Sequence, residues 1–426
     1  MREPAAPGPS RPAVAVVYGG ALLSGLTVVS FPASSTVLRA LHHLTDAEYG
    51  SIFLPQAGLT IVGSLVGGTL AARLGLKALH ALSLLLFALA EACLCAVAFV
   101  PSSAALPVLL VGTGLMGLGF GLAAAPLNSY PGLLYPRRAE PALVALHTLL
   151  AFGFALGPLA VAALVDGGLW LAFPASIAAL SAVAAVATLR LPLPAARAAT
   201  GGTAPPTPCE AGVGSGDDAP PPALADPAAS PPLVILALFG LLAVAYAIAE
   251  GTYSNWAAVY LHEDVGLSDT VAPLGITAFW VALALGRLGV SGLVARVPAE
   301  VVWLGLPVAM AAVFLLLPYA SNAVTGIGLF LLAGLAASAF FPLTVAIASK
   351  RYPGREALVA SLLTAALMLG VGGGTYLLGA LRRALDFVTI YRLSAAYPAV
   401  ALLLAILALA LSRRAAAPAG SLEQGT

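Results

Sequence analysis

The chain has 426 residues, of which 60% are hydrophobic and only 9% are charged, and its mean hydropathy is +1.00. A soluble globular protein carries about 25% charged residues, so this composition excludes a chain with an all-aqueous surface and predicts a multi-pass membrane protein. The formal net charge of +1, with no basic stretch interleaved with aromatic residues, predicts no nucleic-acid partner.

A membrane-spanning helix needs about 20 apolar residues, and twelve stretches of this sequence meet that need. The first stretch follows a Pro-rich segment, 1–12, which we expect to be a cytoplasmic tail. Because this stretch is long enough to span a bilayer, we predict no cleavable signal peptide. The predicted spans are 13–38, 50–72, 78–100, 105–130, 141–165, 167–189, 233–261, 270–295, 300–319, 323–348, 357–380 and 389–412.

A long non-membrane segment, 191–232, separates the sixth span from the seventh. It is rich in Pro, Gly and Ala, and such a composition is typical of disorder, so we predict a disordered cytoplasmic linker. The chain then divides into a six-helix bundle at 13–190, a second six-helix bundle at 233–412 and a cytoplasmic tail at 413–426.

The Lys and Arg residues are distributed unevenly between the two sides of the predicted spans. With both termini inside, 15 of the 19 basic residues lie on the cytoplasmic side and four on the outer side. Because cytoplasmic loops carry an excess of Lys and Arg, we predict a protein of the cell (inner) membrane with both termini in the cytoplasm. The four outer residues are Arg39, Arg382, Arg383 and Arg392.

The two halves repeat each other. Segment 63–73 aligns without gaps with segment 286–296, and both begin with Gly and end with Arg. At another fixed offset, Gly153 and Gly157 match Gly370 and Gly374. Two matching six-span halves are typical of a duplicated transporter that holds its solute near the bilayer midplane between the halves.

These features resemble the major facilitator superfamily. The turn after the second span of that family reads G-x-x-x-D-R/K-x-G-x-R/K, and segment 68–77 keeps the glycines and the bases but has Ala72 in place of the Asp. The resemblance implies an all-α fold of twelve transmembrane helices in two pseudo-symmetric halves, and transport by alternating access. It also implies that the interaction made by the Asp is weakened or rebuilt here. The residues that we assign to a cytoplasmic gate are Gly68, Arg73, Gly75, Lys77, Arg287 and Arg296.

Three segments are similar to the sugar-transporting branch that includes fucose permease, namely 117–128, 153–158 and 249–256. That branch uses acids in spans 1 and 4 for proton coupling, and neither span has one here. Gly153–Pro158 also resembles the span 5 motif of drug and proton antiporters. Close helix packing is an alternative reason for these glycines.

Glu250 is a carboxylic acid about mid-way along the seventh predicted span. An ionisable group at membrane depth costs at least ~2.5 kcal/mol, so its presence suggests function. Tyr246, Glu250 and Tyr253 recur at i, i+4 and i+7, so a helix would present them on one face. Glu250 could carry a coupling proton, accept a hydrogen bond from the solute, or tie its helix to a neighbour.

Further polar and aromatic residues could bind a solute by hydrogen bonding or stacking. Alternative interpretations are an interfacial position for Trp256 and a role in helix association for Gln56. Glu91, in the third span, is expected to turn inward to a structural partner. The further candidates are Gln56, Asn128, His147, Asn255, Trp256 and Trp280.

Phosphate-loop, nucleophile-elbow and metalloprotease patterns are absent from the sequence, and its histidines and cysteines are scattered. We therefore predict no enzymatic activity, cofactor or metal. The prediction is a monomeric secondary transporter, in the lipid bilayer, of a small polar solute such as a sugar or an organic metabolite, with proton coupling through Glu250 as one option. Two alternatives are proton-coupled efflux of drug-like or amphipathic compounds and a non-transporting or lipid-handling membrane protein.

Overall fold

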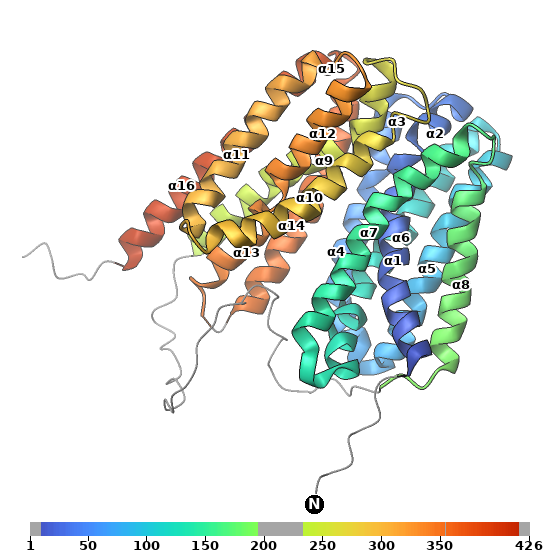
Figure 1. The fold of residues 1–426 in the computed structure, drawn as a ribbon, viewed down its shortest axis with the longest axis horizontal. Coiled ribbons are helices and arrows are strands. Elements are labelled where there is room, and N and C mark those ends of the chain that lie inside the picture. The colour runs from blue at the N-terminus through green and yellow to red at the C-terminus, as the bar shows by residue number, and fades with distance from the viewer. Residues whose placement is uncertain (1–9, 195–232, 354, 417–426) are drawn as a thin grey trace, which may run out of the picture.

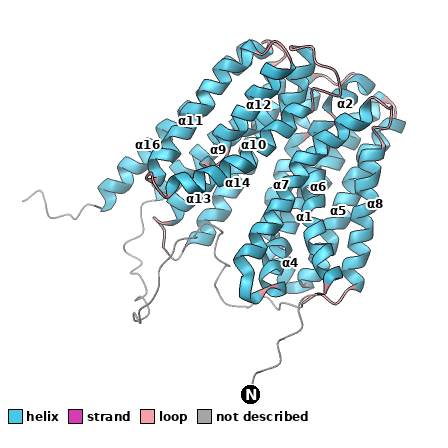
Figure 2. Cartoon of the chain, in the orientation of Figure 1, coloured by secondary structure: helices cyan, strands magenta, loops and turns pink. Residues whose placement is uncertain are grey.

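The computed structural model describes residues 10–194, 233–353 and 355–416. Within these ranges the chain is helical with connecting loops and no strand (Figure 2). Twelve helical stretches in the described part are long and apolar enough to cross a membrane, as the sequence predicted. Lipid offers no hydrogen-bond partner to a peptide group, so each apolar stretch satisfies its backbone internally as a helix.

The first half contains six spans and two short helices. Its short helix α2 connects the first and second spans at one end of the bundle, and the short helix α3 begins the second span, Asp46–Leu74 (Figure 1). Most of the predicted 191–232 linker lies outside the described residues. The helices are α1 (Arg11–Ala33), α2 (Ser35–His42), α3 (Asp46–Ser51), α4 (Phe53–Leu74), α5 (Leu76–Ala96), α6 (Ser102–Leu134), α7 (Ala139–Val165) and α8 (Ala172–Arg190), with single 3₁₀ turns at Val97–Phe99 and Pro136–Arg138.

The second half also contains six spans, and two of them are interrupted. The tenth span consists of α12 and α13, and the twelfth of α15 and α16. The helices are α9 (Leu233–Glu263), α10 (Leu274–Val294), α11 (Ala299–Leu316), α12 (Ala323–Ala337), α13 (Phe340–Ser349), α14 (Glu356–Leu381), α15 (Phe387–Ser394) and α16 (Ala396–Ala416), with a 3₁₀ turn at Leu317–Tyr319.

Glycines allow equivalent pairs of spans to approach closely in the two halves. A Cβ on Gly153 of α7 would lie 2.5 Å from the backbone oxygen of Leu22 in α1. A Cβ on Gly370 of α14 would lie 2.5 Å from the backbone oxygen of Val244 in α9. Spans 5 and 1 therefore pack as spans 11 and 7 do, which agrees with the internal repeat. Close packing is sufficient to explain these glycines.

The two halves meet at the end that carries α2, α3 and α15, which we call the closed end, and diverge toward the opposite, divergent end (Figure 1). At the closed end α14 packs against α3 and α4. A Cβ on Gly379 would collide with the backbone oxygen of Asp46, and one on Gly372 would collide with the Cβ of Ala57. The helices α7 and α10 form a further contact between the halves.

Candidate functional site

Glu250 lies on α9, 13 residues before the end of that helix at Glu263, or about 20 Å along its axis. Its side chain is half-buried. The carboxyl group is within hydrogen-bonding reach of the Tyr246 hydroxyl and within electrostatic range of the Arg287 guanidinium. A phenol and a cation therefore lie near the acid that the sequence singled out, although Arg287 and Glu250 form no ion pair within 4.0 Å among those of the described residues.

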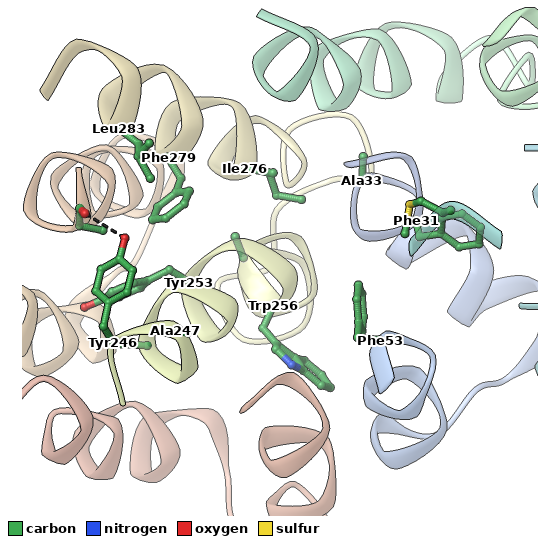
Figure 3. Close-up of a cluster of buried hydrophobic side chains, with 14 of the residues drawn as sticks. Phe31, Ala33, Phe53, Tyr246, Ala247, Tyr253, Trp256, Ile276, Phe279 and Leu283 are labelled. Carbon is green, nitrogen blue, oxygen red and sulfur yellow. Dashed lines mark hydrogen bonds between the residues drawn. The ribbon is translucent and has the colours of Figure 1, made fainter. Parts of the chain in front are cut away.

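The Tyr246 hydroxyl constrains the proton on this acid. It donates to the backbone oxygen of Ala337 over 3.0 Å (Figure 3). A phenol has one proton to donate and can also accept. Because that proton is directed to Ala337, the Tyr246 hydroxyl can accept a hydrogen bond from Glu250 whenever this acid is protonated.

Arg287 lies on α10, 13 residues after the start of that helix at Leu274 and within the span. Its Nε donates to the backbone oxygen of Ser338 over 3.0 Å. That oxygen lies between α12 and α13, where the interruption of the tenth span leaves carbonyls without their usual helical partners. Arg287 and Tyr246 thus supply donors to adjacent carbonyls at this break, while the Arg287 side chain stays exposed.

The sequence predicts a gate position for Arg287 and gives no prediction of its proximity to Glu250, which only the structure shows. The signal was present in the sequence, because the predicted span 270–295 has Arg287 well inside its boundaries. A basic residue inside a span is as unusual as an acidic one, so it also suggests a function.

Two predicted residues of the first half pair with each other. The Nε2 of His147, on α7, lies 3.1 Å from the Oδ1 of Asn128, on α6. The Asn128 Nδ2 donates to the backbone oxygen of Ala124 over 2.8 Å, which orients the amide. Because an amide oxygen only accepts, His147 must carry a proton on Nε2. Both side chains are exposed.

The two halves also meet through aromatic rings. Trp280 of α10 stacks on Phe154 of α7, with ring centroids 4.6 Å apart. Close by, the Thr277 hydroxyl donates to the backbone oxygen of Ala155 over 3.0 Å. His147 also lies within electrostatic range of Arg287. Helix α7 of the first half thereby lies against α10 of the second half, which carries Arg287. We call the following residues the central cluster: Asn128, His147, Tyr246, Glu250, Trp280 and Arg287.

Three other candidates on α9 lie in helix contacts. Tyr253 is buried and donates to the backbone oxygen of Met310 over 2.7 Å, whereas Trp256 leaves α9 in another direction (Figure 3). Trp256 is buried, and its Nε1 donates to the backbone oxygen of Thr375 over 3.1 Å. Asn255 donates to the Thr375 hydroxyl over 2.9 Å. Because protein atoms satisfy these donors, we leave Tyr253, Asn255 and Trp256 out of the proposed solute site. The buried position of Trp256 also does not fit an interfacial residue.

Gln56 and Glu91 are buried polar residues of the first half. Gln56 contacts α6 through its backbone, and its Oε1 is buried without a hydrogen-bond partner in the described ranges. Glu91 of α5 is fully buried and faces Thr27 and Ser30 of α1. It therefore turns inward, as expected, but neither of its carboxyl oxygens has a hydrogen-bond partner in the described part of the chain. Within the described part of the chain, neither Gln56 nor Glu91 contacts the central cluster.

The remaining gate residues lie toward the divergent end. Arg73 and Arg296 are exposed, Lys77 is half-buried, and none of the three forms an ion pair within 4.0 Å in the described part of the chain. Gly68 has open space around its Cβ position. Gly75 ends α4 with φ +83°, a conformation that favours glycine. This accounts for one glycine of the turn motif without a role in gating.

Four charged residues join the halves at the closed end: Arg39, Asp46, Glu263 and Arg382. The distance between Arg39 Nη2 and Glu263 Oε1 is 2.6 Å, and that between Arg382 Nε and Asp46 Oδ2 is 3.3 Å. Each of these ion pairs connects one half to the other. Two further pairs, Arg39 with Asp46 and Arg382 with Glu263, lie within a half. We call these four residues the charge quartet.

The charge quartet was not predicted, although two of its members had a signal in the sequence. Arg39 and Arg382 are among the four basic residues on the side with few positive charges. Next to the charge quartet, Tyr49 of α3 packs against α9. The Tyr49 hydroxyl donates to the backbone oxygen of Asn255 over 2.8 Å, and its ring is 5.0 Å from that of Trp256.

Residues 17–306 match the family model described as Major Facilitator Superfamily. A 61-residue segment is 44% identical to the "Uncharacterized transporter y4wD" of Sinorhizobium fredii (strain NBRC 101917 / NGR234); it represents 14% of this chain and spans only 16% of that relative. Among solved structures, the fold is similar to that of a D-xylose-proton symporter, with a TM-score of 0.71 and 14% identity over 93% of this chain and 96% of the other. It is also similar to that of the nucleoside transporter NupG, with a TM-score of 0.68 and 16% identity over 94% and 98%.

Proposed function

Because the chain belongs to the Major Facilitator Superfamily, we propose that it is a secondary transporter that moves a small polar solute across the cell membrane by alternating access. The observation that carries this proposal is the central cluster, in which His147 of the first half and Glu250 of the second lie within electrostatic range of Arg287, all inside helices long enough to span the membrane. Duplicated transporters hold their solutes at such a place. The similar folds of a D-xylose-proton symporter and a nucleoside transporter support a polar solute.

We propose that the described conformation is open toward the cytoplasm. The halves diverge at the end where α1 begins and α8 ends, and the charge quartet joins them at the other end (Figure 1). Arg73, Lys77 and Arg296 lie toward the divergent end, and cytoplasmic surfaces carry an excess of basic residues. In the outward-open state the ion pairs of the charge quartet between the halves must separate.

Glu250 is the proposed proton-binding residue. It faces Tyr246 on its own helix and Arg287 on α10, and Arg287 in turn faces His147 on α7. With Glu250 ionised, its charge balances that of Arg287; with Glu250 protonated, the Arg287 charge becomes available to another anion. Binding of one proton therefore changes the electrostatics of the central cluster. Since one chain supplies every residue of the central cluster, we propose that a monomer is sufficient.

The test is solute flux in proteoliposomes that contain the full chain. Labelled sugars, nucleosides and organic acids are offered under pH gradients of either sign. We expect the wild type to accumulate one class of solute, and Glu250→Gln to lose this accumulation while it retains exchange of labelled for unlabelled solute. Glu300→Gln, a charge-matched change at the start of α11, is the control and should accumulate as the wild type does. Unchanged accumulation by Glu250→Gln would refute proton coupling at this residue, and no flux of any solute would refute transport of these classes.

A further inference from the structure

The central cluster contains a cation, Arg287, and the protein uses only some of its hydrogen-bond donors. The Arg287 Nε is directed to Ser338, but its two terminal nitrogens have neither a hydrogen bond nor an ion pair within 4.0 Å in the described ranges of the chain. A guanidinium at membrane depth is costly unless another group compensates for its lost hydration. The exposed side chain of Arg287 therefore presents an available binding group between the halves.

The guanidinium is suited to a planar anion. Its terminal nitrogens can donate two parallel hydrogen bonds to the oxygens of one carboxylate. The bond from Nε to Ser338 fixes the other edge of the group, and the hydrogen bond from Tyr246 to the neighbouring carbonyl of Ala337 holds the same break in the tenth span. Little freedom of the side chain is then lost when a ligand binds.

The charges of the central cluster limit the ligand to one negative charge. Arg287 is a permanent cation, and the ionised Glu250 balances it in the absence of solute. An anion next to an ionised Glu250 would leave one negative charge in excess. If Glu250 takes up a proton from water as the anion binds, the net charge of the group stays at zero. A phosphate monoester, with a charge of about −1.5 to −2, would exceed the single charge that Arg287 supplies.

We propose that the transported solute is a monocarboxylate, that Arg287 binds its carboxylate, and that Glu250 carries the accompanying proton. This inference rests on the proposed function and adds the chemical class of the solute. The stacked rings of Trp280 and Phe154 offer an apolar surface to the remainder of the molecule. His147 is the other titratable group that faces Arg287, and its Nε2 proton is directed to Asn128.

The test compares carboxylates with neutral molecules of the same skeleton. The pairs are lactate and 1,2-propanediol, gluconate and sorbitol, and benzoate and benzyl alcohol, so that size and aromatic character vary independently of charge. Binding to the purified full chain is measured by calorimetry at acidic and at neutral pH. We expect at least one carboxylate to bind more tightly than its neutral counterpart, and to bind more tightly at acidic pH. A pH indicator in weak buffer should record the uptake of one proton for each anion bound.

Variants separate the roles of the two residues. Loss of a charged hydrogen-bonding pair should weaken carboxylate binding by Arg287→Gln about 10- to 100-fold at each pH. Arg287→Lys keeps the charge without the planar pair of donors and should bind at an intermediate level. Glu250→Gln is permanently neutral, so it should bind the carboxylate at neutral pH as tightly as at acidic pH, with no proton uptake.

Four results would overturn the proposal. If no carboxylate binds better than its neutral counterpart at acidic pH, the solute class is wrong. If Arg287→Gln lowers the melting temperature but keeps the preference for the carboxylate, Arg287 only ties α10 to the break in the tenth span. If Glu250→Gln keeps the pH dependence, the proton binds elsewhere. Proton-driven flux of sugars or nucleosides with no preference for carboxylates would refute this inference and leave the proposed function intact.

Discussion

The ion pair between Arg39 and Glu263 gives a direct test of how the closed end is held together. Its two atoms lie 2.6 Å apart, and the side chains are 15% and 30% exposed. An exposed ion pair contributes roughly 0–1 kcal/mol, and a hydrogen bond to a charged group about 1.5–3 kcal/mol. For this partly exposed pair we take about 1–2 kcal/mol, so Glu263→Gln should raise the population that is open at the closed end about 5- to 30-fold.

Thiol labelling from outside measures that population. Val259 is buried beside the charge quartet, and Val259→Cys places a thiol of similar size there once Cys93, Cys95 and Cys209 have been replaced. The labelling rate should rise about 5- to 30-fold when Glu263→Gln is added. Asp269→Asn is the matched control, because Asp269 lies 3.5 Å from His262 within the same half; it should change the rate little. Equal rates for Glu263→Gln and Asp269→Asn would refute the role of the ion pair between the halves.

Two further predictions concern packing. Gly153→Ala places a Cβ 2.5 Å from the backbone oxygen of Leu22, so it should destabilise the protein by about 1–3 kcal/mol and lower its melting temperature. Gly58→Ala is the control and should leave the melting temperature unchanged, because no atom lies within 4 Å of its Cβ position. Equal effects of the two variants would contradict the close contact of α1 and α7. Tyr253→Phe removes the hydrogen bond to Met310 and should lower the stability by about 1 kcal/mol without changing the solute affinity. Weaker affinity at unchanged stability would instead place Tyr253 in the solute site.

The sequence predicted the spans well because the bilayer imposes a simple requirement. An apolar stretch of sufficient length must form a helix, since its peptide groups have no partner in lipid. The prediction for the seventh span, 233–261, thus lies close to α9, Leu233–Glu263. The repeat was visible for a related reason, because only small residues permit the contacts made by Gly153 and Gly370.

The orientation of polar side chains was harder to predict. Helical spacing correctly placed Tyr246 beside Glu250. It also placed Tyr253 on the same face, yet the structure directs Tyr253 to Met310. A face of a helix is wide enough to contact more than one neighbour, and spacing alone does not say which neighbour each residue meets.

The sequence by itself determined that this is a membrane protein of two repeated six-helix halves, and it identified Glu250 as an acid at membrane depth. Only the tertiary structure brought Arg287 within electrostatic range of Glu250 and paired Arg39 with Glu263, 224 residues apart. Hydropathy and backbone hydrogen bonding act over about 20 consecutive residues, so a sequence reports them directly. Ion pairs between helices depend on which helices become neighbours and how they tilt, and packing of the whole chain decides both.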